Sequence, residues 1–242
     1  MGTIDSSEFD LHGHTKYSAF NEFVNYTPED AIKRAKEVGL DGIAITGHDT
    51  VQGLDEALNI AAREGVIVVP GIEISSRIGF RMPHILALGV TPEEVDRSKH
   101  PIPRFKSPDT VITWIHDHGG IAIAAHPSEK GKLTHLSYEE VKMLTEKIEG
   151  IEVVTTLGQN EAMTKLAEEK NLAGLGSSDY HMLSQIGLVG TRVFGKVETY
   201  QDVIQSIREK KVEAFIRTDI PEELQGGRSP DILLRQWRGE KL

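Results

Sequence analysis

The sequence predicts a single α/β barrel in which short strands alternate with amphipathic helices. Its 242 residues lie within the range of about 200–250 residues that one barrel domain commonly occupies. About seven strand–helix units follow one another, and such repeats imply a parallel sheet covered by helices. No linker rich in Gly, Ser or Pro interrupts them. We therefore expect residues 1–242 to form one domain.

The strands are predicted from compact apolar runs that end at turn residues. The first strand ends within residues 9–12, and residues 42–46 (GIAIT) form a buried second strand. Residues 66–75 lead into the motif GIEIS as a third strand. Further strands are expected at residues 83–90, 121–125, 151–155, 173–176, 192–194 and 212–216. The units at residues 190–242 are expected to complete and cover the barrel.

The helices are predicted from capping signals and apolar periodicity. Thr27 precedes Pro28, which is typical of a helix start, and Gly39 ends the helix of residues 28–38. Further helices are expected at residues 54–63, 108–118, 138–147, 161–170 and 203–209, with a short amphipathic helix after Gly226. Residues 96–108 contain prolines and little periodicity, so we expect a loop there.

The composition excludes several classes of function. Lys plus Arg is 27 and Asp plus Glu is 37, which gives a net charge of −10 and disfavours binding to long nucleic acid. The absence of cysteine excludes thiolate metal sites, cysteine nucleophiles and disulfides. No apolar run reaches the roughly 18 residues of a membrane span. The acidic N-terminus has no secretory apolar segment, so we expect a cytoplasmic protein.

Eight residues able to bind metal fall almost entirely at the ends of predicted strands, where parallel barrels build their active sites. In the extended motif DLHGH, His12 and His14 point to the same face. Glu73 lies between isoleucines, and a buried carboxylate without a partner is costly. The full set is His12, His14, His48, Glu73, His84, His126, Asp179 and His181.

A lone histidine at a strand end is more often structural than a ligand, but eight such residues together indicate a metal centre. Imidazole and carboxylate donors suit zinc, manganese or iron. Eight ligands exceed the four that one zinc needs, so two or more ions are implied. Two ions can share a hydroxide and clamp an in-line displacement. The remaining histidines, in loops or on helices, are expected to be solvated: His100, His116, His118 and His135.

The motifs DLHGHT, AITGHDT, GIEIS, AAHP and SSDYH occur in this order over residues 9–181. This set resembles the PHP family, named for polymerases and histidinol phosphatases. The resemblance implies a distorted (β/α)7 TIM-like barrel and phosphoester hydrolysis by up to three ions. It also implies a first ion held by His12, His14, Glu73 and Asp179. Glu73 would bridge to a second ion with His84 and His126, and His48 and His181 would help to hold a third.

The sequence departs from the family pattern in two ways near the third ion. Ala19 and Phe20 stand where the family usually has a further Asp or His, and Gly47 stands where it commonly has the Asp of TDH. We therefore expect two or three divalent ions, with a sound two-metal core and a weak or absent third site. Asn21, Glu22 or Asp49 are alternative ligands.

Phosphate-binding residues are expected in a locally basic stretch. Its members are Arg77, Arg81, Arg97, Lys99, Arg104 and Lys106. Arg77 follows Glu73 closely and is the best candidate, whereas Arg192 and Arg228 are weaker ones and a solvated surface loop is the alternative. Tyr17, Phe20 or Tyr180 could stack on a base or sugar, or could be packing residues.

These features predict a metal-dependent phosphoesterase acting on a small phosphorylated molecule, through a metal-bridging hydroxide. Asp179, His181 and Arg77 are the expected catalytic residues, the first two moving the proton. A nucleotide or short oligonucleotide is the first choice of substrate, and histidinol phosphate the second. Another metal-dependent hydrolase of the amidohydrolase type, or an inactive PHP module that binds a partner, are the rival hypotheses. The motifs specify neither the metal nor the oligomeric state.

Overall fold

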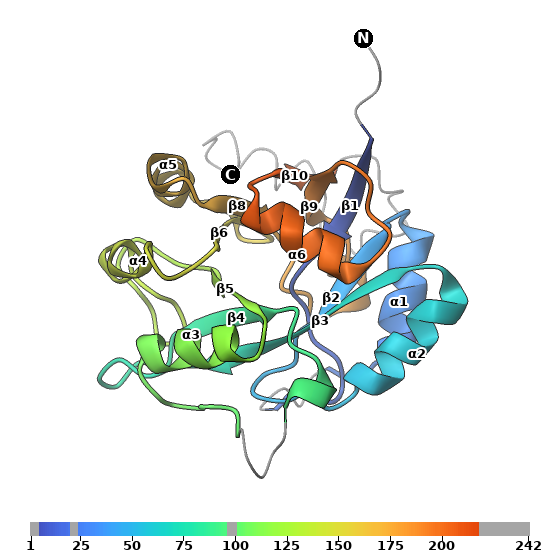
Figure 1. Ribbon diagram of the computed structural model, residues 1–242, viewed down its shortest axis with the longest axis horizontal. Coiled ribbons are helices and arrows are strands. Elements are labelled where there is room, and N and C mark those ends of the chain that lie inside the picture. The colour runs from blue at the N-terminus through green and yellow to red at the C-terminus, as the bar shows by residue number, and fades with distance from the viewer. Residues whose placement is uncertain (1–4, 20–23, 96–100, 218–242) are drawn as a thin grey trace.

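The strands form one strongly curled sheet with helices around it (Figure 1). The computed structural model describes residues 5–19, 24–95 and 101–217. Along the sheet the order is β10-β9-β1-β2-β3-β4-β5-β6-β7, and β8 pairs with β6. The strands are β1 (Ser6–Asp10), β2 (Gly42–Ile45), β3 (Ile67–Ser75), β4 (His84–Leu88), β5 (Ile121–Ala124), β6 (Gly150–Thr155), β7 (Gly158–Gln159), β8 (Ala173–Gly176), β9 (Val189–Phe194) and β10 (Val212–Ile216).

The expected helices between residues 28 and 209 are all present, and their caps follow from the sequence. Thr27 accepts a hydrogen bond from the backbone N–H of Asp30 at 3.1 Å, and Pro28 occupies the first turn. The helices are α1 (Pro28–Glu37), α2 (Leu54–Glu64), α3 (Pro108–Asp117), α4 (Tyr138–Leu144), α5 (Glu161–Lys170) and α6 (Tyr200–Arg208), with 3-10 turns η1 (Pro92–Glu94) and η2 (Leu183–Gln185). The helix expected after Gly226 lies outside the described residues, and so does part of the 96–108 loop.

The expectation of an all-parallel sheet is wrong. β4 runs antiparallel to both β3 and β5, and β9 runs antiparallel to β1 and β10. The reason at β4 is chain length, because residues 76–83 are too few for the crossover of about a dozen residues that parallel neighbours require. A hairpin is therefore the available connection. The short strand β7, which pairs antiparallel with β6, was also not expected.

Two hydrophobic layers hold the barrel together. The outer layer packs α1 to α5 against the sheet, with Ile32, Leu54 and Ile115 among its members. The inner layer fills the barrel with side chains from most of the strands, such as Phe9, Leu86 and Leu175. A buried Val, Leu, Ile or Phe side chain contributes roughly 1.5–3 kcal/mol. These two layers account for the fold without metal or disulfide.

Helix α6 closes one end of the barrel and leaves the other end for polar residues. Val203, Ile204 and Ile207 of α6 belong to the inner hydrophobic layer. Arg208 donates hydrogen bonds to the carbonyls of Gly119 and Gly120, just before β5 begins. The opposite end, where the parallel strands finish, is therefore the open face. None of the helices in the described part combines the length and hydropathy that a membrane-spanning helix needs.

Candidate metal centre

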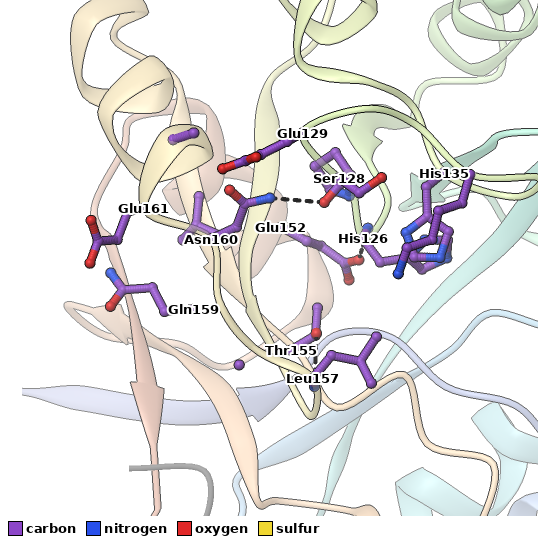
Figure 2. A pocket seen from close by; sticks show the side chains of 15 residues that line it. His126, Ser128, Glu129, His135, Glu152, Thr155, Leu157, Gln159, Asn160 and Glu161 are labelled. Carbon is purple, nitrogen blue, oxygen red and sulfur yellow. Dashed lines mark hydrogen bonds between the residues drawn. The ribbon is translucent and has the colours of Figure 1, made fainter. Parts of the chain in front are cut away.

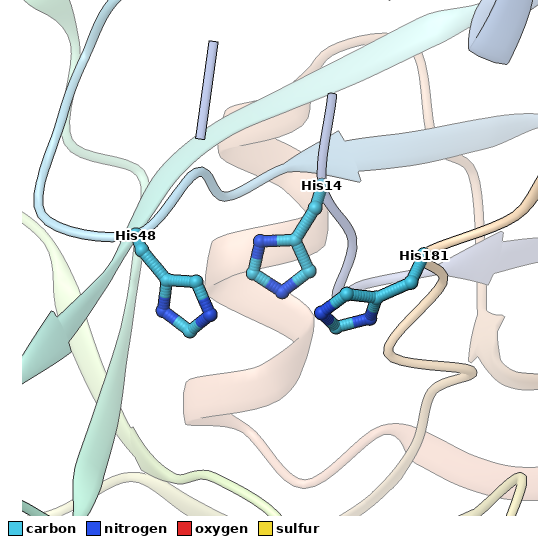
Figure 3. Close-up of side chains that lie close together, drawn as sticks. All are labelled: His14, His48 and His181. Carbon is cyan, nitrogen blue, oxygen red and sulfur yellow. The ribbon is translucent and has the colours of Figure 1, made fainter. Parts of the chain in front are cut away.

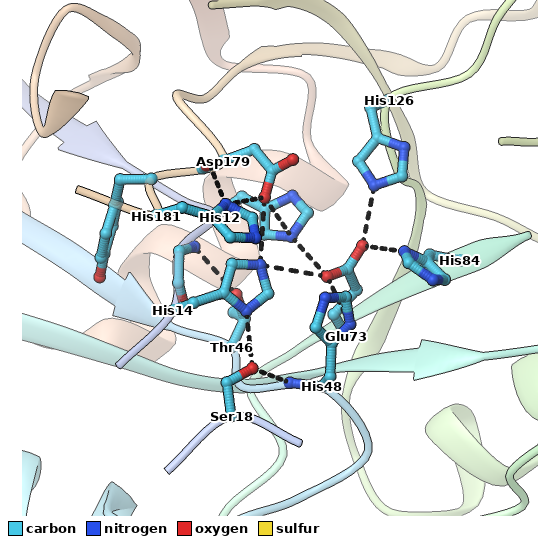
Figure 4. A network of polar contacts seen from close by, with 12 residues as sticks. His12, His14, Ser18, Thr46, His48, Glu73, His84, His126, Asp179 and His181 are labelled. Atoms are coloured by element: carbon cyan, nitrogen blue, oxygen red, sulfur yellow. Dashed lines mark hydrogen bonds and ion pairs between the residues drawn. The ribbon is translucent and has the colours of Figure 1, made fainter. Parts of the chain in front are cut away.

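All eight predicted metal-binding residues lie together at the open end of the barrel (Figure 4). Most follow the carboxyl end of a strand. His84 instead begins β4, and the antiparallel pairing of β4 with β3 places it opposite Ser75 at the same edge. The strand reversal that the sequence did not reveal therefore explains why this ligand candidate stands at the start of its strand.

Glu73 is the centre of the cluster, and its two carboxylate oxygens face different histidines. Oε2 lies 3.2 Å from His12 Nε2, 3.2 Å from His14 Nε2 and 3.0 Å from His48 Nδ1. Oε1 lies 2.6 Å from His84 Nδ1 and 2.8 Å from His126 Nε2. Its side chain is fully buried. One carboxylate thus joins two separate sets of imidazoles.

Asp179 completes the cluster on the solvent side. Its Oδ1 lies 3.1 Å from His14 Nε2, 3.6 Å from His12 Nε2 and 3.6 Å from His181 Nδ1. The side chains of Asp179 and His181 are 28% and 39% exposed. Asp179 and His126 have positive φ angles of 51° and 30°. Such backbone is unfavourable for residues other than glycine, and it clusters at functional sites.

Glu152 supports the cluster, and the sequence analysis missed it. This buried carboxylate on β6 accepts hydrogen bonds from His12 Nδ1 at 3.0 Å, from the backbone N–H of His126 at 2.6 Å and from the Ser177 hydroxyl. A carboxylate on the far nitrogen fixes the ring and leaves Nε2 to face a metal. The signal was present, because Glu152 interrupts the apolar run GIEVV as Glu73 interrupts GIEIS.

Asp10 and Thr46 hold the strand ends that carry the cluster. Asp10 is fully buried and accepts from the backbone N–H of Ser178 at 2.9 Å, from its hydroxyl at 2.5 Å and from Gly187 N–H at 3.1 Å. Burial raises the pKa of Asp10 to about 7, against the lowering effect of these hydrogen bonds. The Thr46 hydroxyl accepts from Gly13 N–H at 3.0 Å.

Gly13 cannot carry a side chain, because Tyr180 packs against its backbone. A Cβ built on Gly13 would lie 1.9 Å from Cε1 of the buried Tyr180 ring. Gly13 and Tyr180 also form a parallel bridge, in which Tyr180 O accepts from His14 N–H at 3.1 Å. Glycine at the centre of DLHGH therefore lets the segments of His12 and Asp179 lie side by side.

The charges of the cluster favour a bound cation. Burial would lower the pKa of His12, but the Glu152, Glu73 and Asp179 carboxylates raise it well above its ordinary value. Burial likewise opposes ionisation of Glu73, yet the surrounding histidines hold its pKa well below the usual range. His48 behaves differently, because burial lowers its pKa to about 3. The carboxylates thus create a negative potential that bound protons or divalent ions can neutralise.

The donor set fits divalent ions. His12 Nε2 and Glu73 Oε2 are buried without a hydrogen-bond partner, and buried polar atoms without partners are rare in proteins. The donor atoms of His12, His14, Glu73 and Asp179 all lie within 4.8 Å of one another, as do those of His48, Glu73 and His84. His126 Nε2 contacts the same Glu73 oxygen as His84. A shared carboxylate between two such sets is the arrangement that a pair of ions needs.

A third set consists of His14, His48 and His181 and contains no carboxylate (Figure 3). His14 also faces Glu73 and Asp179, so this set shares a ligand with the first. Near it, Gly47 has no side chain, and Ala19 only donates its backbone N–H to His48 O at 3.3 Å. Phe20, Asn21 and Glu22 lie outside the described residues. Asp49 points elsewhere: it accepts from Ser75 N–H at 2.8 Å and pairs with Arg104.

A pocket of about 470 Å³ opens beside the cluster (Figure 2). Its lining residues include His126, Glu152, Lys132, Leu157 and Asn160. His135 also lines it, with its ring centroid 4.6 Å from that of His126. The expectation that His135 is a solvated histidine is therefore wrong, because the residues 128–137 loop folds back over His126. His118 is also buried, and its Nδ1 lies 2.7 Å from Trp114 O.

The residues predicted to contact the substrate lie in different parts of the fold. Arg192 forms an ion pair with Glu8 on β1 at 2.8 Å, and Glu8 precedes His12 by four residues. Tyr180 is a packing residue whose hydroxyl donates to Ala44 O at 2.7 Å. The Tyr17 hydroxyl donates to Glu56. Arg77 remains at the open end, as part of a pocket with Phe80 and Phe105.

Arg81 pairs with Glu140 and donates to His135 O, so it holds the β3–β4 hairpin to α4. Lys106 is exposed, and its carbonyl accepts from Arg77 N–H at 2.8 Å. The remaining basic candidates, Arg97, Lys99 and Arg228, lie outside the described residues. His100 also lies outside them, whereas His116 is partly exposed and pairs with Glu149 at 3.2 Å.

The fold and the cluster together define a barrel protein with a histidine- and carboxylate-rich candidate metal centre at the open end of its barrel. Comparison with known protein families identifies the family to which this barrel belongs. The profile of the PHP domain family matches residues 10–215. The chain therefore belongs to the PHP domain family, as its motif order indicated.

Curated relatives match parts of the chain. An uncharacterised protein of Methanocaldococcus jannaschii is 35% identical over 125 residues, which cover 49% of this chain and 66% of that protein. A 3′,5′-nucleoside bisphosphate phosphatase of Chromobacterium violaceum is 36% identical over 36% of this chain and 30% of its own length. A phosphoribosyl 1,2-cyclic phosphate 1,2-diphosphodiesterase of Eggerthella lenta is 40% identical over 34% of this chain and 30% of its own length. The chain thus spans less than two thirds of these relatives.

Solved structures share the fold. A two-domain protein of Bacteroides vulgatus, described as containing a predicted PHP-like metal-dependent phosphoesterase, superposes with a TM-score of 0.72. It is 19% identical, over 89% of this chain and 66% of that one. A structure described as an amidohydrolase from Chromobacterium violaceum has a TM-score of 0.60 at 19% identity, over 87% of this chain and 98% of that one. At these identities the likeness concerns the fold alone.

Proposed function

We propose that this protein is a metal-dependent phosphoesterase acting on a small phosphorylated substrate, with a nucleotide or short oligonucleotide as the first choice. The observation that carries the proposal is the position of Glu73, whose two oxygens face His12, His14 and His48 on one side and His84 and His126 on the other. Two divalent ions bound on either side of this carboxylate would neutralise phosphoryl charge and lower the pKa of water.

The chain's own residues then have distinct roles in this proposal. Glu152 orients His12 through Nδ1, so that Nε2 faces the centre. Asp179 and His181 lie on the exposed side of the cluster, and we assign to them the receipt and return of a proton. Burial lowers the pKa of His181, which keeps its imidazole neutral and able to accept a proton at neutral pH. Arg77 would bind an anionic oxygen of the substrate.

The experiment is a hydrolysis panel of nucleotides, short oligonucleotides, histidinol phosphate, simple amides and lactones. It is run with Mn²⁺ and with chelator on wild type, His126→Ala and His116→Ala. His116 is the control, because it is partly exposed and pairs with Glu149 rather than with the centre. Metal-dependent turnover of phosphoesters that His126→Ala abolishes and His116→Ala retains supports the proposal. Turnover confined to amides or lactones, or none with bound metal, overturns it.

A further inference from the structure

A second groove leads away from the metal centre along the β3–β4 hairpin. It consists of two adjoining cavities of about 340 Å³ each, which share Met82 and Phe105. The inner cavity reaches the metal-ligand candidates His48 and His84. The outer cavity is lined by Arg77, Gly79 and Phe80 in addition to the shared residues. We call this the aromatic groove. It is separate from the pocket beside His126, because the two have no lining residue in common.

The walls of the aromatic groove expose large apolar side chains. Phe80 is 98% exposed, Phe105 is 38% exposed and Met82 is 36% exposed. Single exposed apolar residues are ordinary, whereas several around one concave surface indicate a binding site. Phe80 offers a flat face, and the Phe105 ring has the Arg104 guanidinium over it at 5.3 Å from the ring centroid. Arg77 is the one arginine or lysine that lines the groove in the described part of the chain.

Backbone hydrogen bonds fix the walls of the groove. Phe105 N–H donates to Ser75 O at 2.7 Å, and Arg77 N–H donates to Lys106 O at 2.8 Å. The hairpin tip is closed by reciprocal hydrogen bonds between Ile78 and Arg81 at 3.1 and 3.0 Å. Phe105 has φ of 58°, a conformation that such a side chain adopts only when its surroundings enforce it. These bonds hold Phe105 beside the metal centre at a conformational cost.

The position of the groove indicates which part of a substrate it would bind. Its inner end reaches His48 and His84, which in the proposed function lie beside the ions that neutralise the phosphoryl charge, so its outer part would receive what is attached to the phosphoryl group. A sugar or polyol would leave its hydroxyl groups against apolar walls without partners. A planar aromatic group would stack on phenylalanine faces.

We propose that the aromatic groove binds the nucleobase of a nucleotide substrate, with Phe80 and Phe105 as stacking residues that determine specificity. This proposal rests on the proposed function for the position of the phosphoryl group. Sequence reasoning did not single out either residue, because neither lies in a metal-binding motif.

The test measures equilibrium binding to metal-loaded protein, so that it does not depend on turnover. The probes are the non-hydrolysable phosphonate analogues of adenosine 5′-monophosphate and ribose 5-phosphate, together with inorganic phosphate, titrated calorimetrically. The variants are Phe80→Ala, Phe80→Tyr and Phe105→Ala, with Met143→Ala as the matched control on α4, where the side chain is 71% exposed. Phe80 is almost fully exposed, so its removal does not threaten folding. Leu157→Ala examines the pocket beside His126.

Wild type is expected to prefer the adenosine monophosphate analogue over the ribose 5-phosphate analogue. Phe80→Ala and Phe105→Ala should each weaken nucleotide binding about tenfold, within the range of base stacking. Neither should change the affinity for the ribose 5-phosphate analogue. Phe80→Tyr should retain the preference. No preference in wild type, or equal losses for both probes, overturns the groove assignment even if phosphoesters are hydrolysed. The groove assignment is also overturned if only Leu157→Ala loses nucleotide affinity, or if the phenylalanine variants change only in oligomeric state. A preference without any turnover would instead overturn the proposed function.

Discussion

His12 and Glu152 form a buried pair in which the imidazole Nδ1 donates to the carboxylate at 3.0 Å while Nε2 faces Glu73 and Asp179. The pair joins β6 to the segment that follows β1. A ligand held in this way keeps one tautomer and one orientation, which raises its affinity for metal.

Glu152→Gln should therefore weaken metal binding by about 10–100-fold, because outer partners of ligating histidines contribute that much. Calorimetric titration of the apo protein with Zn²⁺ or Mn²⁺ measures it. Glu139→Gln, at an exposed position on α4, is the control and should bind as wild type does. An unchanged affinity in Glu152→Gln would show that His12 is not a ligand oriented by Glu152.

We expect two ions to be held tightly and a third weakly or not at all. The third set has no carboxylate, and it shares His14 with the first set. Elemental analysis after gel filtration should find two ions per chain in wild type. His181→Ala should retain both, whereas Glu73→Gln should lose both, because Glu73 faces each of the two sets. Three ions that survive gel filtration would contradict this prediction.

Metal removal should lower thermal stability. Buried histidines and carboxylates that converge without an ion leave polar atoms unpaired, as at His12 Nε2 and Glu73 Oε2. An ion at about 100 times its Kd stabilises the folded state by about 2.7 kcal/mol, which corresponds to a Tm shift of roughly 5–10 °C for a chain of this size. Thermal melts with Mn²⁺ and with chelator measure the shift. Identical melts would indicate a centre that does not bind the ion.

Acid should weaken the junction of β1 and β9 in a defined way. Burial opposes ionisation of Glu8, but hydrogen bonds from Arg192 and Arg217 hold its pKa below the ordinary 4.5. The folded state therefore binds the proton less readily than the unfolded state. The stabilisation is complete above about pH 4.5 and is lost as pH falls through the folded pKa.

Urea denaturation of wild type and Glu8→Gln at about pH 7 and pH 3.5 tests this linkage. Glu8→Gln should be less stable by no more than about 1 kcal/mol at neutral pH, since partly exposed ion pairs contribute little. The difference should shrink at the lower pH. Glu213→Gln, at a side chain that is 60% exposed, should change stability less. A stability difference that grows on acidification would show that folding does not lower the pKa of Glu8.

Several features followed from sequence alone because they depend on local chemistry. Thr27 and Pro28 specify a helix start through a side-chain cap and a fixed φ, and α1 begins there. Apolar runs of four to six residues specified β2, β5 and β8. The motif order also indicated the family, and the eight ligand candidates lie together as the strand-end pattern implied.

Tertiary structure decided what depends on residues distant in the chain. The antiparallel direction of β4 is a matter of hairpin closure, and it brings His84 to the edge where the other ligand candidates lie. The partner of His12 is 140 residues away, so no local pattern shows that Glu152 supports a ligand. Phe80 and Phe105 meet across one groove only because Ser75 pairs with Phe105 through the backbone. Local sequence determined which elements form and which donors stand at strand ends, because capping and apolar burial act over a few residues. Strand direction and long-range hydrogen bonds determined which atoms those donors face.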